Sequence, residues 1–521
     1  MNRTTLSLIA GVAALAAVTG FATLDAPDTS GADTAKAAAR LPVERTGLVC
    51  PAPSSSDLAE TAYTSFTPVT KGAAAKGTAH LTAATEESTD ATGKTDGKDG
   101  KTDGKDGKTD GKAGKSKEKG GKTAAKPVLA PKAPGTPATG TTSGGTTPAY
   151  LGTAEGAYAP GWTLQETTEV AAGTGRGLLG VNCTAPDTEF WFPGASTAAD
   201  RTDYVHLTNP DDSAAVVDIE LYGPDGALQT TVGEGITVPP HASDPILLST
   251  LTAEKQDAVT VHVNVRSGRV GAAVQALDDK LGGDWLAPAG DPAGSLVIPG
   301  IPKDAVSVRL VAFAPGNADA DLKVQLASST GLITPAGHET LHVKGKMSAS
   351  VDLGDVTRGE AGSLVLTPTD DAVPVVAAVR VVRGKGDDQE SAFIPATADV
   401  GTRASVADNR AKAATLSLTA PTGTAQVKVT SSAGSEGGAT ASQTYTLKPG
   451  TTQDVVPPAP QGLKGTYAIT VEHVSGAPVY AARTLLSTDK DTPGFTIQTL
   501  PDDRGTVSVP EADENLDVLQ R

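Results

Sequence analysis

Short segments in which apolar and polar residues alternate recur along most of the chain. The alternation is complete in Val259–Val265 and nearly so in Val216–Tyr222. Because successive side chains of an extended chain point to opposite sides, this pattern predicts β-strands. Turn-forming sequences such as Asn209-Pro210 and Gly223–Gly226 separate the strands. The 3.6-residue period of amphipathic helices is nearly absent, so the pattern predicts an all-β protein.

Two short phrases recur at a spacing of about 105 residues, which indicates tandem copies of one domain. The first phrase ends in two alanines, and its copies are Arg269–Ala273, Pro374–Ala378 and Pro478–Ala482. The second carries a large apolar residue shortly before a proline, and we assign it to Trp191–Gly194, Val297–Gly300 and Phe393–Ala396. One period earlier, Arg176–Val181 is the expected counterpart of the first phrase, which predicts a degenerate additional copy.

This period predicts tandem β-sandwiches of the immunoglobulin-like or fibronectin-like type, each with about seven short strands. A β-propeller is the alternative, because each period could supply two blades and Phe495–Ile497 could close the ring. The predicted sandwich domains are a degenerate first domain made of 41–70 plus 150–186, and three repeats at 187–291, 294–398 and 402–500.

The segments outside these domains lack strand patterning. Residues 1–24 combine a basic start with the apolar run Leu6–Leu24, which predicts either a cleaved signal peptide or an uncleaved N-terminal membrane anchor. Residues 71–149 are rich in Lys, Asp and Gly and then in Pro and Thr, so we expect a disordered insert. A flexible stalk is expected at 25–40 and an acidic tail at 501–521.

The chain has two cysteines, Cys50 and Cys183. In an exported protein such a pair predicts a disulfide. Here the bond would join the two halves of the first domain, which the insert separates. Metal binding by the two cysteines is the weaker interpretation, because no histidine pattern lies near them.

The net charge of the chain limits the classes of partner that it is expected to bind. The formal net charge is −17 at pH 7. An acidic protein gains nothing from neutralising phosphates, so a nucleic-acid partner is not expected. The basic insert is the exception, and its lysines suit screened attraction to anionic wall polymers.

The sequence contains no recognisable catalytic constellation. Gly434–Gly437 lacks the spacing of a nucleophile elbow. His338 and His342 have the spacing of a zinc-binding pair on a helix, but they fall in a strand-and-turn sequence. Acidic pairs such as Asp278-Asp279 fall in turns, where carboxylates are normally solvated. We therefore expect a non-enzymatic protein with no catalytic residues, no metal and no cofactor.

Three tryptophans are the remaining candidates for ligand contacts. Trp285 follows Gly282-Gly283 in a glycine-rich connection, which makes it the best candidate for an exposed residue that stacks on a sugar. Trp162 is the second candidate. Trp191 belongs to a repeat phrase, so we expect it to pack inside the protein.

Several features together resemble a known group of proteins. They are the apolar N-terminus, Cys50-Pro51, Arg176–Gly180 leading to Cys183, and Phe190–Gly194. This combination resembles the exported proteins of high-GC actinobacteria that are carried as a domain of unknown function. The resemblance implies location and bacterial type, and it offers no activity, cofactor or site.

From these observations we expect a non-enzymatic, exported cell-envelope protein, anchored or secreted, with a structural or interaction role. Its expected partners are cell-wall polymers or envelope proteins. The alternatives are a glycan-binding protein that uses Trp285 or Trp162, and an unrecognised hydrolase, which would need converging carboxylates in a cleft.

Overall fold

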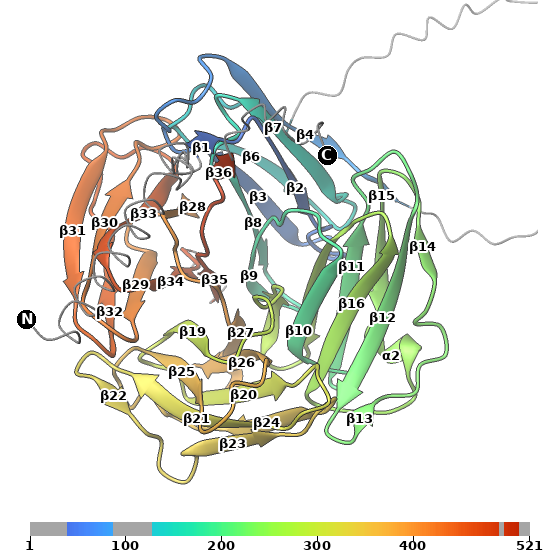
Figure 1. Cartoon of the computed structure of the whole chain (residues 1–521). Coiled ribbons are helices and arrows are strands. Elements are labelled where there is room, and N and C mark those ends of the chain that lie inside the picture. The colour runs from blue at the N-terminus through green and yellow to red at the C-terminus, as the bar shows by residue number, and fades with distance from the viewer. Residues whose placement is uncertain (1–38, 87–127, 489–493, 510–521) are drawn as a thin grey trace, which may run out of the picture. The chain divides into compact units, whose positions relative to one another are not determined.

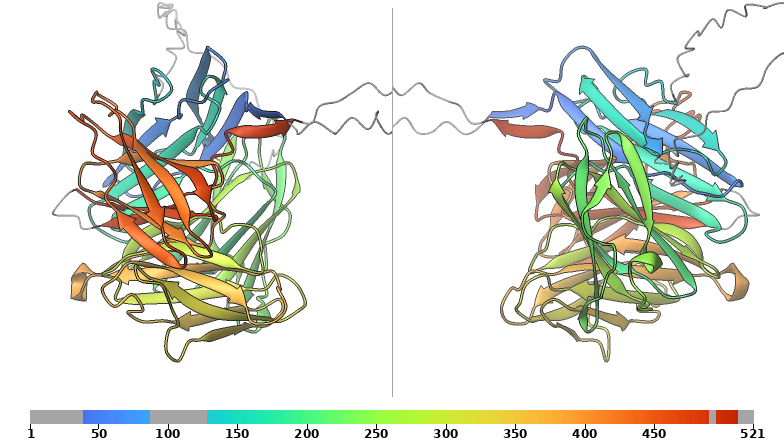
Figure 2. Two further views of the ribbon diagram at one scale, coloured as in Figure 1. Left: turned by 60° about the vertical axis from the view of Figure 1, so that its left-hand side comes forward. Right: turned by 90° about the vertical axis from the view of Figure 1, so that its right-hand side faces the viewer.

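The strands of the chain pair mostly into antiparallel sheets. The computed structural model describes residues 39–86, 128–488 and 494–509. The described residues divide into two units. In the smaller unit, β1 (Ala39–Pro42) and β36 (Thr506–Val509) form a two-stranded sheet, and Figure 2 shows them side by side. The larger unit comprises residues 42–505 and contains four β-sandwiches (Figure 1).

The first sandwich is built from two chain segments, on either side of residues 87–127. One sheet has the order β2-β7-β4, and the facing sheet has the order β6-β3-β8-β9. The strands are β2 (Arg45–Cys50), β3 (Ala59–Phe66), β4 (Gly77–Ala83), β6 (Ala138–Ser143), β7 (Tyr150–Gly156), β8 (Thr163–Val170) and β9 (Gly177–Asn182).

The second sandwich repeats this plan. Its sheets have the orders β10-β16-β12-β13, with β14 also on β12, and β18-β17-β11-β15-β5. The short β5 (Thr85–Glu86) comes from the first chain segment and pairs in parallel with β15. The other elements are β10 (Glu189–Ala195), β11 (Arg201–Thr208), β12 (Ala215–Gly223), β13 (Gly226–Ala227), β14 (Ile236–Val238), β15 (Ala242–Leu247), α2 (Leu248–Leu251), β16 (Val259–Ser267), β17 (Gly271–Asp278) and β18 (Gly282–Leu286).

The third sandwich lies on a continuous chain segment. Its sheets have the orders β19-β25-β21-β22, with β23 also on β21, and β24-β20-β26-β27. The elements are β19 (Leu296–Ile301), β20 (Ser307–Phe313), β21 (Ala320–Ala327), β22 (Leu332–Ile333), β23 (Thr340–Val343), β24 (Ser348–Asp352), β25 (Gly362–Pro368), β26 (Val376–Arg383), the 3₁₀ turn η2 (Gly386–Asp388) and β27 (Glu390–Pro395).

The fourth sandwich also lies on one segment, with sheets β28-β33-β30-β31 and β32-β29-β34-β35. The strands are β28 (Arg403–Asn409), β29 (Ala414–Ala420), β30 (Ala425–Ser431), β31 (Ala441–Leu447), β32 (Thr451–Val455), β33 (Tyr467–Gly476), β34 (Tyr480–Leu486) and β35 (Phe495–Thr499).

The all-β sandwich prediction is therefore confirmed, whereas the propeller alternative is wrong. The alternation of apolar and polar residues along the strands explains why the chain forms sandwiches and not a propeller. Each repeat folds into two facing sheets whose inward side chains share one apolar core, instead of forming a single sheet that serves as a blade. Within the described residues, no set of strands closes into a barrel or a propeller.

Two assignments of repeat phrases are corrected by the strand order. The Phe393 phrase lies in β27, which ends its sheet, whereas Trp191 and Val297 lie in β10 and β19 of the other sheet. Likewise Arg176–Val181 leads into β9, which ends its sheet as β18 does, so it does not correspond to the Arg269 phrase. The first error arose because edge strands of the two facing sheets carry a similar apolar residue before a proline, and the second because an edge strand and a central strand carry similar small apolar residues.

The expected boundaries of the unpatterned segments were also too wide. β4 and β6 fall inside 71–149, and β36 falls inside 501–521. Both β4 and β6 are edge strands with many exposed Thr, Gly and Ala residues, so they join a sheet through backbone hydrogen bonds and leave little apolar pattern. The expected signal peptide or anchor, most of the stalk, and the Lys/Asp/Gly centre of the insert lie outside the described residues.

Neighbouring sandwiches contact one another through buried residues. Ala273 and Trp285 of the second sandwich pack on the first, and Trp191 packs on Phe313 of the third. Ala482 and other residues of the fourth join the core of the third. Phe66 of the first packs on Ala407 and Ala468 of the fourth, so the contacts form a cycle within residues 42–505. The edge strands β9, β18, β27 and β35 contact one another in the same cyclic order (Figure 1).

Candidate functional site

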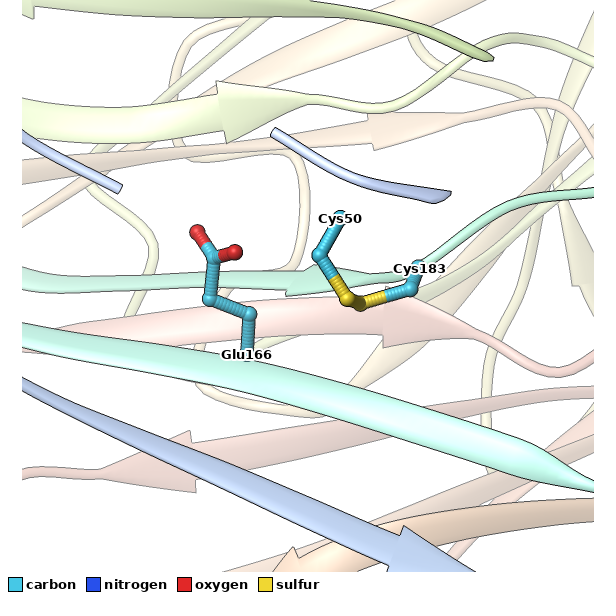
Figure 3. Close-up of side chains that lie close together, drawn as sticks. All are labelled: Cys50, Glu166 and Cys183. Carbon is cyan, nitrogen blue, oxygen red and sulfur yellow. A yellow bond between two sulfur atoms is a disulfide. The ribbon is translucent and has the colours of Figure 1, made fainter. Parts of the chain in front are cut away.

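Cys50 and Cys183 form the disulfide that the sequence predicts (Figure 3). Their Sγ atoms are 2.01 Å apart, although 133 positions separate the two residues in the sequence. Cys50 ends β2, and Cys183 directly follows β9. Both side chains are buried in the core of the first sandwich, so the bond joins its two chain segments.

The two tryptophans expected to contact a ligand are buried, so that prediction is wrong. Trp285 is 2% exposed and Trp162 is 4% exposed. The glycines before Trp285 serve close packing instead of a loop, because a Cβ on Gly283 would lie 2.9 Å from the Cα of Gly175. Trp162 donates its indole N–H to Ser65 Oγ at 2.8 Å. Neither ring offers a surface on which a sugar could stack.

Trp191 is buried, as its place in a repeat phrase predicts. Its ring stacks on His262 with centroids 3.7 Å apart and lies 5.4 Å from the ring of Phe313. His262 in turn contacts the carboxylates of Glu189 and Glu220. These contacts make Trp191 a packing residue between the second and third sandwiches.

The carboxyl group of Glu166 lies beside the disulfide (Figure 3). Glu166 is in the middle of β8, on the same side of the strand as the core residue Leu164. Both of its side-chain oxygens are buried and have no hydrogen-bond partner in the described part of the chain. Burial raises the pKa of Glu166 well above its usual range, because a low-dielectric core disfavours the charged form.

Glu166 faces a second unpaired polar group. Tyr63 lies directly opposite on β3, and its hydroxyl is buried without a hydrogen-bond partner among the described residues. Burial, and then the neighbouring Glu166, raise the pKa of Tyr63 well above its usual value. The ring of Tyr150 on β7 packs edge-on against Tyr63, with centroids 5.0 Å apart. The opposite neighbour on β9 is the apolar Val181.

Cys50, Cys183 and Glu166 are the one group of three potential metal ligands among the described residues. One ligand atom from each lies within 4.8 Å of the other two. In the disulfide, however, the two sulfurs are bonded to each other and offer no thiolate. His338 and His342 do not join such a group, and His342 instead contacts Asp321 at 2.8 Å.

A buried carboxyl also occupies the junction of the edge strands. Asp284 of β18 accepts hydrogen bonds from the Gly180 N–H at 3.1 Å and from the Thr496 hydroxyl at 2.9 Å. These partners belong to the first and fourth sandwiches. Burial raises the pKa of Asp284 well above its usual range, although the hydrogen bonds oppose the shift. A Cβ on Gly180 would lie 2.6 Å from Thr496, so the junction requires glycine there.

A cleft of about 750 Å³ lies between the third and fourth sandwiches. One wall is the outer face of the sheet β32-β29-β34, from which hydroxyl groups of Thr415, Ser417 and Thr484 project, because they alternate with inward residues such as Leu416. The volume is typical of a site for a small molecule or a short stretch of polymer.

A triangle of buried hydroxyl groups adjoins the cleft, and one of its members, Thr452, lines the cleft. Ser363 Oγ and Thr419 Oγ1 are 2.7 Å apart, and Thr452 Oγ1 lies 3.0 Å from each. Ser363 belongs to the third sandwich and the two threonines to the fourth. The triangle therefore holds the two sandwiches together beside the cleft.

The third and fourth sandwiches both contribute charged side chains to the cleft, and these include positive and negative groups. Asp304 accepts a hydrogen bond from Arg383 at 3.0 Å, and Ser417 donates a hydrogen bond to Asp454. The charged lining residues are Lys303, Asp304, Glu360, Arg383, Lys448 and Asp454. Among the described residues that line the cleft, cations and anions are equal in number and none is aromatic. The lining thus offers hydrogen-bond donors and acceptors without a net charge.

Sequence reasoning missed both Glu166 and the cleft. A signal for Glu166 was present, because it falls on the apolar phase of a strand that includes Leu164. The cleft had no such signal, since its residues come from separate repeats and read as ordinary solvent-facing threonines, serines and turn residues.

No helix among the described residues is long and apolar enough to span a membrane.

Comparison with known proteins identifies a family and no function. No curated protein and no solved structure matches the chain. One family model, described as a family of unknown function (DUF5719), matches residues 138–458, which is more than half of the chain and runs from β6 to just after β32. The chain therefore belongs to the DUF5719 family.

Proposed function

We propose that the chain is a non-enzymatic, exported protein of the cell envelope with an interaction role, and that it binds a neutral, hydroxyl-rich envelope polymer in the cleft between the third and fourth sandwiches. The cleft carries the proposal. Its serine and threonine hydroxyls and its balanced charges suit hydrogen bonds to a glycan better than contacts to a polyphosphate.

Export is supported by two independent features. The basic start and apolar run of residues 1–24 have the composition of an export signal. The Cys50–Cys183 disulfide is of the kind that persists in oxidising compartments. The resemblance to exported actinobacterial proteins agrees with both.

The mode of binding differs from the one that the tryptophans suggested. Without an aromatic lining residue, recognition depends on hydrogen bonds that compete with water. Each bond contributes little net affinity, so we expect weak binding that is best detected on a polymer presenting its ligand at high local concentration.

Co-sedimentation of the full chain with purified cell-wall sacculi tests this proposal. Thr446→Trp places a large ring at the exposed rim of the cleft and should reduce the bound fraction at least about fivefold. Thr340→Trp is the matched control, because Thr340 is also an exposed threonine of a peripheral strand but lies outside the cleft lining. Equal binding by both variants and the unaltered chain would exclude the cleft as the site.

A further inference from the structure

We propose that the first sandwich contains a redox-gated metal site, in which Cys50, Cys183 and Glu166 bind a thiophilic divalent cation such as Zn²⁺ once the disulfide is reduced. The inference does not depend on the proposed cleft. It concerns the reduced protein, whereas the exported protein of the proposed function holds the disulfide oxidised. Two thiolates and a carboxylate form a donor set that zinc accepts in proteins, with a fourth position left for water.

The position of Glu166 is the first argument. A fully buried carboxyl without a hydrogen-bond partner is costly, and the core position that it occupies is otherwise apolar. In the third sandwich, β26 takes the place of β8 and carries the inward Val379. A valine would therefore satisfy the fold at this point, and the carboxyl needs another explanation.

The direction of the carboxyl is the second argument. An oxygen of Glu166 and the two sulfurs all lie within 4.8 Å of one another, in a core that is closed to solvent. Ligand atoms of one zinc ion are about 3 to 4 Å apart, given bond lengths of about 2.0 to 2.3 Å. Breaking the disulfide frees the two sulfurs, which can then separate toward that spacing through side-chain rotation.

The chemistry balances with an external reductant. A water-soluble phosphine transfers two electrons to the disulfide and becomes its oxide with the oxygen of water. The protons of that water convert the two sulfurs to thiols, and the thiols release protons when they bind the cation. The cation would then join the same two chain segments, β2 and the β8–β9 hairpin, that the disulfide joins in the oxidised protein.

Metal titration of the full chain tests the inference. The chain is reduced with the phosphine and titrated with Co²⁺, which gives an intense near-ultraviolet thiolate-to-metal absorption when cysteine binds it. The expected result is one equivalent bound with this absorption in the reduced chain, and neither in the oxidised chain. The melting temperature of the reduced chain should also rise with Zn²⁺.

Two variants distinguish a built site from two loose cysteines. Glu166→Gln keeps the shape and removes the anionic ligand, so affinity should fall at least about tenfold, whereas Glu60→Gln, on the neighbouring strand and exposed, should bind as the unaltered chain does. Absence of stoichiometric binding in the reduced chain would overturn the site. Unchanged affinity in Glu166→Gln would overturn the role of Glu166 and leave no preformed site.

Discussion

The first and third sandwiches share one strand plan but are held together differently. The third lies on a continuous segment, and its core consists of aliphatic side chains and alanines from both sheets, joined by Phe495 of the fourth sandwich. The first is assembled from two segments, and its core contains two tyrosines, Trp162, the disulfide and the carboxyl of Glu166. A chain that leaves a domain and returns gains from a covalent link, whereas a continuous repeat forms its core from apolar side chains without one.

The same comparison separates stability from chemistry. Val379 and Glu166 take corresponding inward positions, and only the glutamate lies beside a reactive bond. The first sandwich therefore gives up some packing and gains a group that can hold a proton or a cation. Four variants test this difference between the two sandwiches.

Placing the carboxyl of the first sandwich into the third should have the largest effect. Val379→Glu buries an unpaired carboxyl in an aliphatic core. If its pKa rises by about 3 to 5 units, the carboxyl is mostly neutral in the folded protein at pH 7, and taking up that proton costs about 3.5 kcal/mol. Burying the neutral carboxyl adds about 1 to 3 kcal/mol. Urea unfolding, followed by protease mapping of residues 292–398, would measure the loss in free energy of unfolding of the third sandwich. Val379→Gln is the control without charge, and a Val379→Glu protein as stable as this control at pH 7 would contradict the prediction.

Removal of the disulfide should follow in size. Cys50→Ser combined with Cys183→Ser opens a loop of more than a hundred residues and should cost the first sandwich about 2 to 5 kcal/mol. Protease protection should be lost in residues 42–86 and 128–186 and kept in the third sandwich. Unchanged protection of the first sandwich would show that its two segments associate without the bond.

A cavity in the third core comes next. Leu310→Ala removes a fully buried side chain from β20 and should cost about 2 to 4 kcal/mol. The midpoint of urea unfolding measures the loss. A cost below about 1 kcal/mol would show that the third sandwich does not depend on apolar packing as proposed.

Glu166→Gln should change how the stability of the protein depends on pH more than it changes the stability at any one pH. Because the folded pKa is raised, the stability associated with Glu166 is fully present below pH 4.5 and is lost as pH rises toward the folded value. The loss is at most about 1.4 kcal/mol per pH unit. Unfolding from pH 4 to pH 8 should show a smaller decline in Glu166→Gln than in the unaltered chain, and identical slopes would refute the assignment.

The fold class was predictable from sequence because the alternation of apolar and polar residues is visible within each single strand. Val259–Val265 reads as a strand without any knowledge of its partners. The recurring phrases indicated three copies, whereas the additional first copy was inferred from Arg176–Val181, which does not correspond to the phrase. The phrases did not reveal strand order, since Phe393 on an edge strand and Trp191 on a first strand carry similar neighbours.

The candidate sites were predictable only where one residue type carries the signal. Two cysteines sufficed for the disulfide. Glycines misled at Trp285, because Gly283 reflects the close approach of Gly175 and not a loop. The cleft depends on how the third and fourth repeats face each other, which no local pattern records.

Cell fractionation with acid quenching and differential alkylation of thiols would show whether the protein is exported with a disulfide in its first sandwich. We expect the native protein in the membrane, wall or secreted fraction, with Cys50 and Cys183 blocked as a disulfide. Recovery in the cytosol with both thiols free would contradict it.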